Sequence, residues 1–223
     1  MRYVIADIHG CLNTLQLLVT NLNLNSIDSL YFLGDYIDKG KSSAKVLDYL
    51  IDLRTQQNVF FLRGNHEANI LETQQNYEPK MFKMFVEKIN KSPCLLNNES
   101  RIIPKYQTFM QDLPYFLELE DFWLVHAGFS PKENFLDEKD YMLEGRNTQY
   151  EIQKFKGKRI VHGHTVTYKQ TIERAVQEQA SIIPLDNGCV YNKSHKIYDY
   201  TQTGNLCCLN LDTFELIWQK NID

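Results

Sequence analysis

The sequence predicts an α/β fold in which strands and helices alternate from the amino terminus. In the first third of the chain, a short apolar run, a polar loop and a stretch with helical spacing of apolar residues follow one another three times. The second half is richer in strand-like runs. Because consecutive βαβ units form parallel strands joined by right-handed crossovers, the loops after these strands should meet at one edge of a sheet.

The apolar runs of the three units are residues 3–6, 29–33 and 59–62. Leucines and valines recur at helical spacing over residues 12–22, which predicts the first helix. Ser42 is a residue type that caps helices well and precedes the second helical pattern. The third run leads into a further helix after Glu67.

The middle of the chain, residues 76–112 approximately, has a helical and aromatic pattern broken at Pro93 and Pro104. We expect it to form a helical insert within one domain that spans residues 1–223. Five later runs are expected to be strands, the last two as a hairpin around Asp212-Thr213: residues 122–125, 159–161, 181–185, 206–211 and 214–218.

The composition excludes several classes of protein. The formal charge of −4 supplies no basic field for nucleic acid, so we expect no nucleic-acid binding. No apolar run has the length of a membrane helix, and Asp7 interrupts the amino-terminal run too early for a secretory signal, so we expect no membrane association. The five cysteines form no Cys-x-x-Cys pair, and their odd number favours reduced thiols in the cytoplasm.

Polar residues that can bind a metal follow five of the predicted strands. Their common feature is a position beside glycine at a strand end, and they are Asp7, His9, Asp35, Asp38, Asn65, His66, His126, and His162 or His164. Asp35 lies 28 residues after Asp7, and Asn65 lies 30 residues after Asp35, one βα unit each. A mixed nitrogen and oxygen set without thiolates suits Mn, Fe or Zn, and its size indicates two ions rather than one.

The order of these loops resembles the calcineurin-like metallophosphoesterases, and within them the PPP-type serine/threonine protein phosphatases and their bacterial and phage relatives. The resemblance is carried by five motifs in the family's order: Asp7-Ile8-His9-Gly10, Gly34-Asp35-Tyr36-Ile37-Asp38-Lys39-Gly40, Gly64-Asn65-His66-Glu67, His126-Ala127-Gly128 and Gly163-His164-Thr165. It implies a sandwich of two sheets flanked by helices, with the metals where the strands end.

The resemblance also implies a role for each residue. The first metal would be held by Asp7 and His9, the second by Asn65, His126 and His164, and both by Asp35. A hydroxide between the metals would attack phosphorus directly, without a covalent phosphoenzyme. His66, oriented by Asp38, would protonate the leaving group. The phosphoryl oxygens would be bound by Lys39, Asn65 and Arg146.

One of these assignments has an alternative, and two depart from the family pattern. His162 could take the place of His164, although the family pattern favours His164. Lys39 stands where the family usually has arginine, which replaces a planar two-pronged donor by a point charge. Arg146 matches the family only loosely. Asp186 is expected to form a turn rather than to support the site, and His195 to lie in a solvated loop.

The predicted function is hydrolysis of a phosphoester with two divalent metal ions, with Mn expected first and Fe or Zn as alternatives. The expected substrate is a phosphoserine or phosphothreonine on a protein. The alternative is symmetrical hydrolysis of diadenosine tetraphosphate, or of another small phosphoester. A catalytically silent binding module of the same fold is the alternative outside enzymes.

Overall fold

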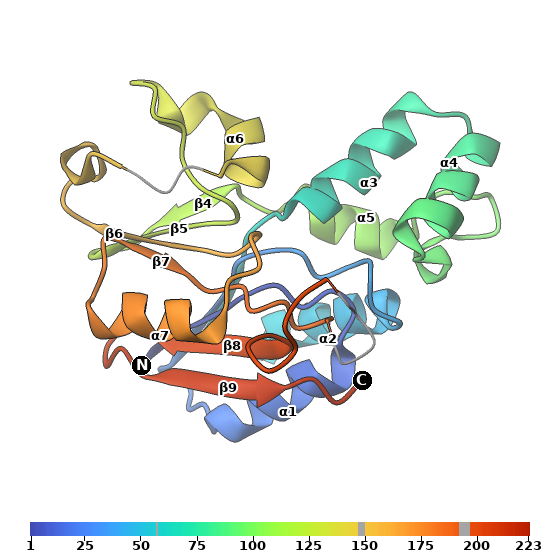
Figure 1. The fold of residues 1–223 in the computed structure, drawn as a ribbon. Helices are drawn as coiled ribbons and strands as arrows, with labels where there is room; N and C mark the ends of the chain where they lie inside the picture. The colour runs from blue at the N-terminus through green and yellow to red at the C-terminus, as the bar shows by residue number, and fades with distance from the viewer. Residues whose placement is uncertain (57, 147–149, 192–196) are drawn as a thin grey trace.

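The computed structural model describes residues 1–56, 58–146, 150–191 and 197–223, which contain two sheets in face-to-face layers (Figure 1). The first sheet has the order β3-β2-β1-β8-β9 and consists of β1 (Arg2–Ile5), β2 (Ser29–Phe32), β3 (Asn58–Phe61), β8 (Asn205–Asn210) and β9 (Leu216–Lys220). The second has the order β4-β5-β6-β7 and consists of β4 (Phe116–Glu118), β5 (Phe122–Val125), β6 (Arg159–His162) and β7 (Ile182–Pro184). The predicted two-sheet α/β architecture is confirmed.

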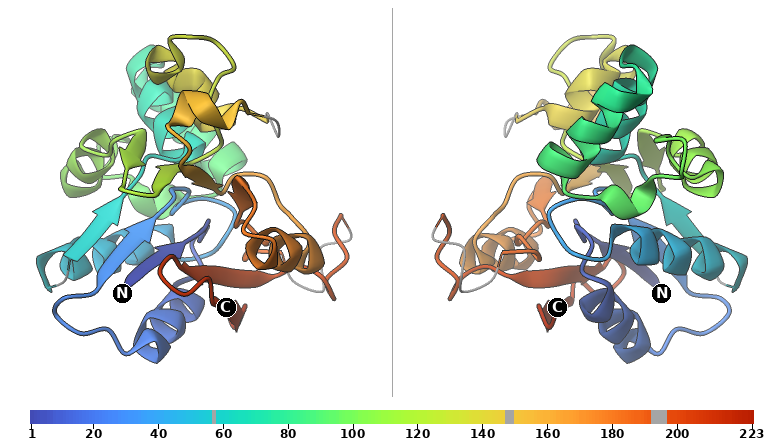
Figure 2. Two further views of the ribbon diagram at one scale, coloured as in Figure 1. Left: turned by 90° about the vertical axis from the view of Figure 1, so that its left-hand side faces the viewer. Right: turned by 90° about the vertical axis from the view of Figure 1, so that its right-hand side faces the viewer.

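Alternation along the strands of the first sheet sends side chains into two cores. Val4 faces the second sheet and packs in one apolar cluster with Leu124 and Val161. Ile5 faces the other way and packs with apolar residues of α1 (Leu12–Leu22) and α2 (Ser43–Gln56). Figure 2 shows these two helices on the outer face of the first sheet. Burial of one such aliphatic side chain contributes roughly 1.5–3 kcal/mol, so the strands are held by the layers on both faces.

Parallel pairing brings the polar loops together. β1, β2 and β3 are parallel neighbours, and so are β5, β6 and β7. The loops that leave the carboxyl ends of these strands are therefore side by side, as expected for ligand sites in open α/β sheets.

The predicted hairpin is present as the antiparallel pair β8 and β9. β9 begins at Leu216 rather than at residue 214, because Phe214 has a positive φ of 59° and belongs to the turn. β4 and two helices, α6 (Lys139–Glu144) and α7 (Lys169–Gln177), lie where the sequence pattern gave no such element. In α7 only Ile172 and Val176 are buried, which is a weak apolar signal for nine residues.

Helices of the middle of the chain lie beside one another to one side of the sheets (Figure 1). They are α3 (Asn65–Asn76), α4 (Pro79–Phe85), a π-helical turn (Val86–Asn90), a 3-10 turn (Pro93–Leu95) and α5 (Pro104–Gln111). Two more 3-10 turns span Phe135–Asp137 and Ile152–Phe155. The expected insert corresponds to the part of this group that follows α3. Among the described residues, no helix has the length and apolar character needed to cross a membrane.

Candidate metal centre and active site

Asp35 lies at the centre of the polar loops. His9 Nε2 is 3.4 Å from its Oδ2 atom, and His126 Nε2 is 3.4 Å from its Oδ1 atom. Potential ligand atoms gather in two sets, one formed by His9, Asp35 and His66 and the other by Asp35, His126 and His164. Because Asp35 belongs to both sets, its two oxygens can serve two neighbouring ions.

Backbone carbonyls orient two of these histidines. His9 Nδ1 lies 2.9 Å from the carbonyl oxygen of Ile37, and His126 Nδ1 lies 2.9 Å from that of Leu33. A carbonyl oxygen can only accept, so each Nδ1 carries the proton and each Nε2 directs a lone pair toward Asp35. Burial lowers the pKa of both imidazoles and keeps them neutral. Metal-binding histidines are held in this way in proteins.

The carboxyl groups of Asp7, Asp35 and Asp186 are buried close to one another in this site. Burial and the charges of Asp186 and Asp35 raise the pKa of Asp7 well above its ordinary value. Burial raises the pKa of Asp186 to about 6. Burial also disfavours the charge of Asp35, but the neighbouring imidazoles and Lys39 outweigh it and lower its pKa. A divalent cation would relieve the repulsion that otherwise favours protonation of Asp7 and Asp186.

Polar side-chain atoms converge on the other side of Asp35. One atom of the Asn65 amide lies 3.0 Å from His126 Nε2, 3.3 Å from His164 Nδ1 and 3.2 Å from Asp35 Oδ1. As Nδ2 this atom donates to the three acceptors, and with the amide turned Oδ1 would face a bound cation instead. His164 Nε2 is buried and has no hydrogen-bond partner among the residues that the structure describes, and burial lowers the pKa of this imidazole to about 4. Such a group of electron pairs is favourable around a cation.

The Lys39 ammonium brings a positive charge to the side of Asp35 where His9 lies. The Lys39 ammonium donates to His9 Nε2 at 2.8 Å. This ammonium occupies the lone pair that an ion bound to His9 would take. The neutral imidazoles and the shared carboxylate of the two ligand sets are what fit divalent metal ions such as Mn, Fe or Zn.

His66 forms a hydrogen-bonded chain at the edge of this group. Its Nδ1 atom is 2.7 Å from Asp38 Oδ2, and its Nε2 atom is 3.9 Å from Asp35 Oδ2. Burial lowers the pKa of His66, but the carboxylates of Asp35 and Asp38 outweigh burial and raise it overall. The Nδ2 group of Asn90 donates to the same Asp38 oxygen. Asn90 was not predicted, and it reaches the site because the π-helical turn ends there.

Glu67 is a second residue whose role sequence reasoning missed. Its fully buried carboxylate accepts hydrogen bonds from the backbone N–H groups of Asp35, Tyr36, Ile37 and Gly64 at 2.9–3.3 Å. It therefore fixes the loop that carries Asp35 against the start of α3. The available signal was its position directly after Asn65-His66, as the third residue of α3, where a glutamate typically accepts a hydrogen bond from the backbone at the start of the helix.

The backbone of the site is unusual at several positions. Five residues of these loops other than glycine have positive φ angles: His9 (48°), Asp35 (54°), Asp38 (67°), Lys39 (59°) and His164 (63°). Close approach of two loops adds a further constraint, because a Cβ atom at Gly64 would lie 2.2 Å from Asp35 Oδ1. At Gly163 it would lie 2.1 Å from Asp7 Oδ1. These glycines let two neighbouring loops touch the carboxylates directly.

The remaining predicted residues occupy different surroundings. Asp7 accepts the backbone N–H of His164 with both oxygens at 3.1 Å. Arg146 is exposed, and its Nη1 atom is 3.5 Å from Thr165 Oγ1. His162 lies outside both ligand sets, with Nδ1 3.1 Å from the carbonyl oxygen of Gly163. Asp186 forms the expected turn, accepting the Gly188 N–H at 2.6 Å, and is also buried beside Asp7. His195 lies outside the described residues.

Comparison with protein families finds one match that covers most of the chain. The model of the calcineurin-like phosphoesterase family matches residues 2–196. Among curated proteins, the symmetrical bis(5'-nucleosyl)-tetraphosphatase of Glaesserella parasuis is 29% identical over 133 residues, which are 58% of this chain and 45% of the relative. That of Buchnera aphidicola is 31% identical over 147 residues, 64% of this chain and 50% of the relative. The matches thus span half or less of these two relatives.

Solved structures show the same fold at lower identity. A putative diadenosine tetraphosphatase superposes with a TM-score of 0.65 at 21% identity, covering 97% of this chain and 91% of the other. A serine/threonine phosphatase from Saccharomyces cerevisiae gives 0.60 at 14% identity, covering 100% and 80%. A cold-active protein-tyrosine phosphatase of Shewanella gives 0.59 at 16% identity, covering 98% and 80%.

Proposed function

Because the chain belongs to the calcineurin-like phosphoesterase family, we propose that it hydrolyses a phosphoester or phosphoanhydride bond with two divalent metal ions bound on either side of Asp35. The observation that carries this proposal is the membership of Asp35 in two sets of ligand atoms, beside the pair His66 and Asp38. Bound ions of this kind polarise phosphoryl oxygens and supply a nucleophile at neutral pH.

We assign the ligands as the motif order implies. Asp7 and His9 would bind the first ion, Asn65, His126 and His164 the second, and Asp35 both. His66 completes one geometric set with His9 and Asp35, but its Nδ1 bond to Asp38 suits a proton donor better than a ligand. Mn is the proposed metal, with Fe and Zn as alternatives, because the donors are nitrogen and oxygen.

Other residues of the chain would bind the charged phosphoryl oxygens and donate the proton to the leaving group. Lys39, Asn65 and Arg146 would bind the phosphoryl oxygens, whose charge rises in the transition state. Asp38 holds the Nδ1 proton of His66, which leaves the Nε2 proton of the imidazolium for the leaving oxygen. The raised pKa of His66 increases the protonated fraction at neutral pH.

Dinucleoside tetraphosphate is the substrate that we propose first. The similarity to two tetraphosphatases favours it over the phosphoprotein expected from the motif order. A phosphoserine or phosphothreonine protein is the second candidate, since the five motifs resemble those of PPP-type phosphatases. We also place the reaction in the cytoplasm, which the five free cysteines support.

The test is turnover of the manganese-loaded protein on diadenosine tetraphosphate and, in parallel, on a phosphothreonine peptide. Faster nucleotide hydrolysis is the expected result. Exclusive peptide turnover would reassign the substrate and keep the metal centre. Absence of turnover on both, and on p-nitrophenyl phosphate with Mn, Fe or Zn, would contradict the enzymatic proposal.

A variant tests the proposed acid. His66→Asn should retain metal binding and lose about a hundredfold or more in kcat where the leaving oxygen needs a proton. His162→Asn is the matched control, because it removes a histidine outside both ligand sets. Unchanged kcat in His66→Asn would remove His66 from the mechanism.

A further inference from the structure

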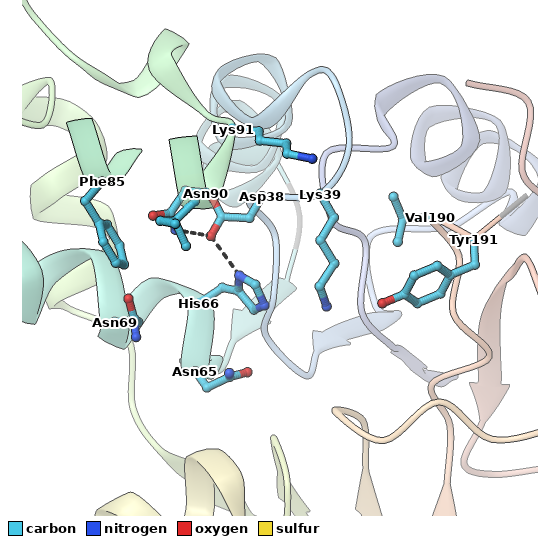
Figure 3. Close-up of a pocket in the computed structure, with 11 residues that line it drawn as sticks. Asp38, Lys39, Asn65, His66, Asn69, Phe85, Asn90, Lys91, Val190 and Tyr191 are labelled. Atoms are coloured by element: carbon cyan, nitrogen blue, oxygen red, sulfur yellow. Dashed lines mark hydrogen bonds and ion pairs between the residues drawn. The ribbon is translucent and has the colours of Figure 1, made fainter. Parts of the chain in front are cut away.

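A cavity of about 400 Å³ opens beside His66, on the side of the helices that follow β3 (Figure 3). Asp38, Lys39, Asn65 and His66 line its inner end, and residues of α4 and the π-helical turn line its outer end. Its size falls in the ordinary range of small-molecule sites. Because an acid must lie next to the oxygen that it protonates, the leaving group of the proposed reaction belongs in this cavity.

The outer end of the cavity carries a positive charge, the ammonium group of Lys91. Lys91 lines the cavity, and Figure 3 shows its ammonium group on the same side as Lys39. In the described part of the chain, no carboxylate forms an ion pair with Lys91, although other exposed lysines, such as Lys105 with Asp48, do. Asp38, the carboxylate that lines the cavity, is engaged by His66 and Asn90.

The backbone fixes Lys91 relative to the chemistry. Lys91 has a φ of 56° and closes the π-helical turn by donating its N–H to the Val86 carbonyl. The preceding residue, Asn90, is bonded to Asp38. A π-helical turn often occurs at a functional site, and here it couples a surface lysine to the residue that orients the proposed acid.

The walls of the same cavity are apolar and aromatic. Phe85 ends α4, and Ile89 belongs to the π-helical turn. Val190 and Tyr191, from the loop after β7, lie at the opposite end from Phe85 (Figure 3). Ile89 is 69% exposed and lies beside Met81, Met84 and Phe85, so the helical side presents an exposed apolar group rather than a single exposed residue. A lysine ammonium beside apolar side chains suits a leaving group in which an anion such as a phosphate is joined to a flat aromatic base.

From these features we infer that the cavity is the subsite for a leaving nucleoside diphosphate, with Lys91 on its α-phosphate and the base against Phe85 and Ile89. This inference rests on the proposed function and specifies its substrate class. Water would add its oxygen to one central phosphorus of a dinucleoside tetraphosphate, the central P–O bond would break, and the departing oxygen would take the proton of His66. The products are two nucleoside diphosphates.

Lys91→Gln tests this subsite against Lys88→Gln, a control on the same turn that does not line the cavity. We expect Lys91→Gln to raise KM for diadenosine tetraphosphate about tenfold, since a charge-assisted hydrogen bond is lost. Its kcat/KM for p-nitrophenyl phosphate, whose leaving group has no phosphate, should stay within about twofold. Lys91→Arg should restore most of the affinity, and Lys88→Gln should match the unaltered protein on both substrates.

Calorimetric binding of ADP gives a readout that does not depend on turnover, and Lys91→Gln should weaken it by a similar factor. Equal ADP affinity and equal KM in Lys91→Gln and the unaltered protein would overturn the subsite. Hydrolysis of p-nitrophenyl phosphate without hydrolysis of the tetraphosphate would also overturn it, while leaving the metal-dependent phosphoesterase intact. Failure on every phosphoester would instead reject the proposed function.

Discussion

At the scale of single residues, the orientation of the proposed acid depends on more than the pair His66 and Asp38. The Oδ2 atom of Asp38 accepts from both His66 and Asn90, and the Asp38 N–H is bonded to Ser43 Oγ at 3.0 Å. Ser43 Oγ lies 3.0 Å from Ser92 Oγ. The carboxylate is thus held from two sides, which is how second-layer groups keep a catalytic side chain in a productive geometry.

Removal of Asn90 should therefore affect proton transfer more than binding. We expect Asn90→Ala to lower kcat about tenfold on an alkyl phosphate and much less on p-nitrophenyl phosphate, whose leaving oxygen needs no proton. Asn69→Ala, which alters the same cavity without a bond to Asp38, is the control. A uniform loss on both substrates would indicate a packing defect instead.

The side chains that gather around Asp35 could be predicted because short local motifs place them directly after strands. Asn90 could not, since it lies 52 residues from Asp38 and nothing in its neighbourhood distinguishes it. Its contact depends on how the helices after β3 fold back. The role of Glu67 escaped notice for a different reason. Its place in the third residue of α3 indicated a bond to Gly64, but its other three partners are backbone N–H groups of the loop that follows β2, and the sequence pattern does not show that contact.

At the scale of elements, aromatic packing joins the helices after β3 to the first sheet. Phe109 of α5 has its ring centroid 5.3 Å from that of Phe61 in β3 and 6.1 Å from that of Tyr36. The hydroxyl of Tyr36 in turn donates to the Leu62 carbonyl at 2.6 Å. This cluster fixes α5 beside the loop that carries Asp35 and Asp38.

Phe109→Ala should lower the free energy of unfolding by about 3–5 kcal/mol, the usual cost of emptying a buried aromatic site. Phe60→Ala is the matched control in the neighbouring strand position, because Phe60 is 43% exposed. It should cost about 1 kcal/mol or less. Urea unfolding of the two variants measures the difference, and equal midpoints would contradict the proposed packing role.

β1 and β2 were predictable because most of their residues are buried on both faces, which gives short continuous apolar runs. β3 also forms an apolar run, although Phe60 is exposed at this edge of the sheet. The second half was harder to interpret. The six residues of α6 bury two apolar side chains, and the nine residues of α7 bury two. So few buried positions do not establish a helical period, and the pattern therefore indicated loops between strands.

At the scale of the whole molecule, the candidate metal centre joins the two sheets. Asp7 follows β1 of the first sheet, and His164 follows β6 of the second, 157 residues later in the chain. Their hydrogen bonds and the two ligand sets around Asp35 bring together loops from both halves. Any ion bound there favours the folded state, because the unfolded chain has no comparable site.

Metal should therefore raise the thermal stability of the protein. With Mn²⁺ at a hundred times its Kd, we expect a gain of about 2.7 kcal/mol per site, reversed by a chelator. Asp35→Asn should abolish most of the gain. Asp48→Asn, at an exposed ion pair with Lys105, should leave it unchanged. Calorimetry with and without Mn²⁺ measures the difference, and an equal gain in Asp35→Asn would contradict the shared-ligand assignment.

The positive φ angles of His9, Asp35, Asp38, Lys39 and His164 have a consequence for laboratory evolution. A left-handed conformation costs a residue with a side chain about 1–2 kcal/mol relative to ordinary backbone, and glycine escapes most of this cost. A library of variants that is selected for heat resistance alone should therefore accumulate glycine at these positions and lose the chemistry. Selection that alternates heat with turnover should instead confine its stabilising changes to the surface and to the helices away from the loops.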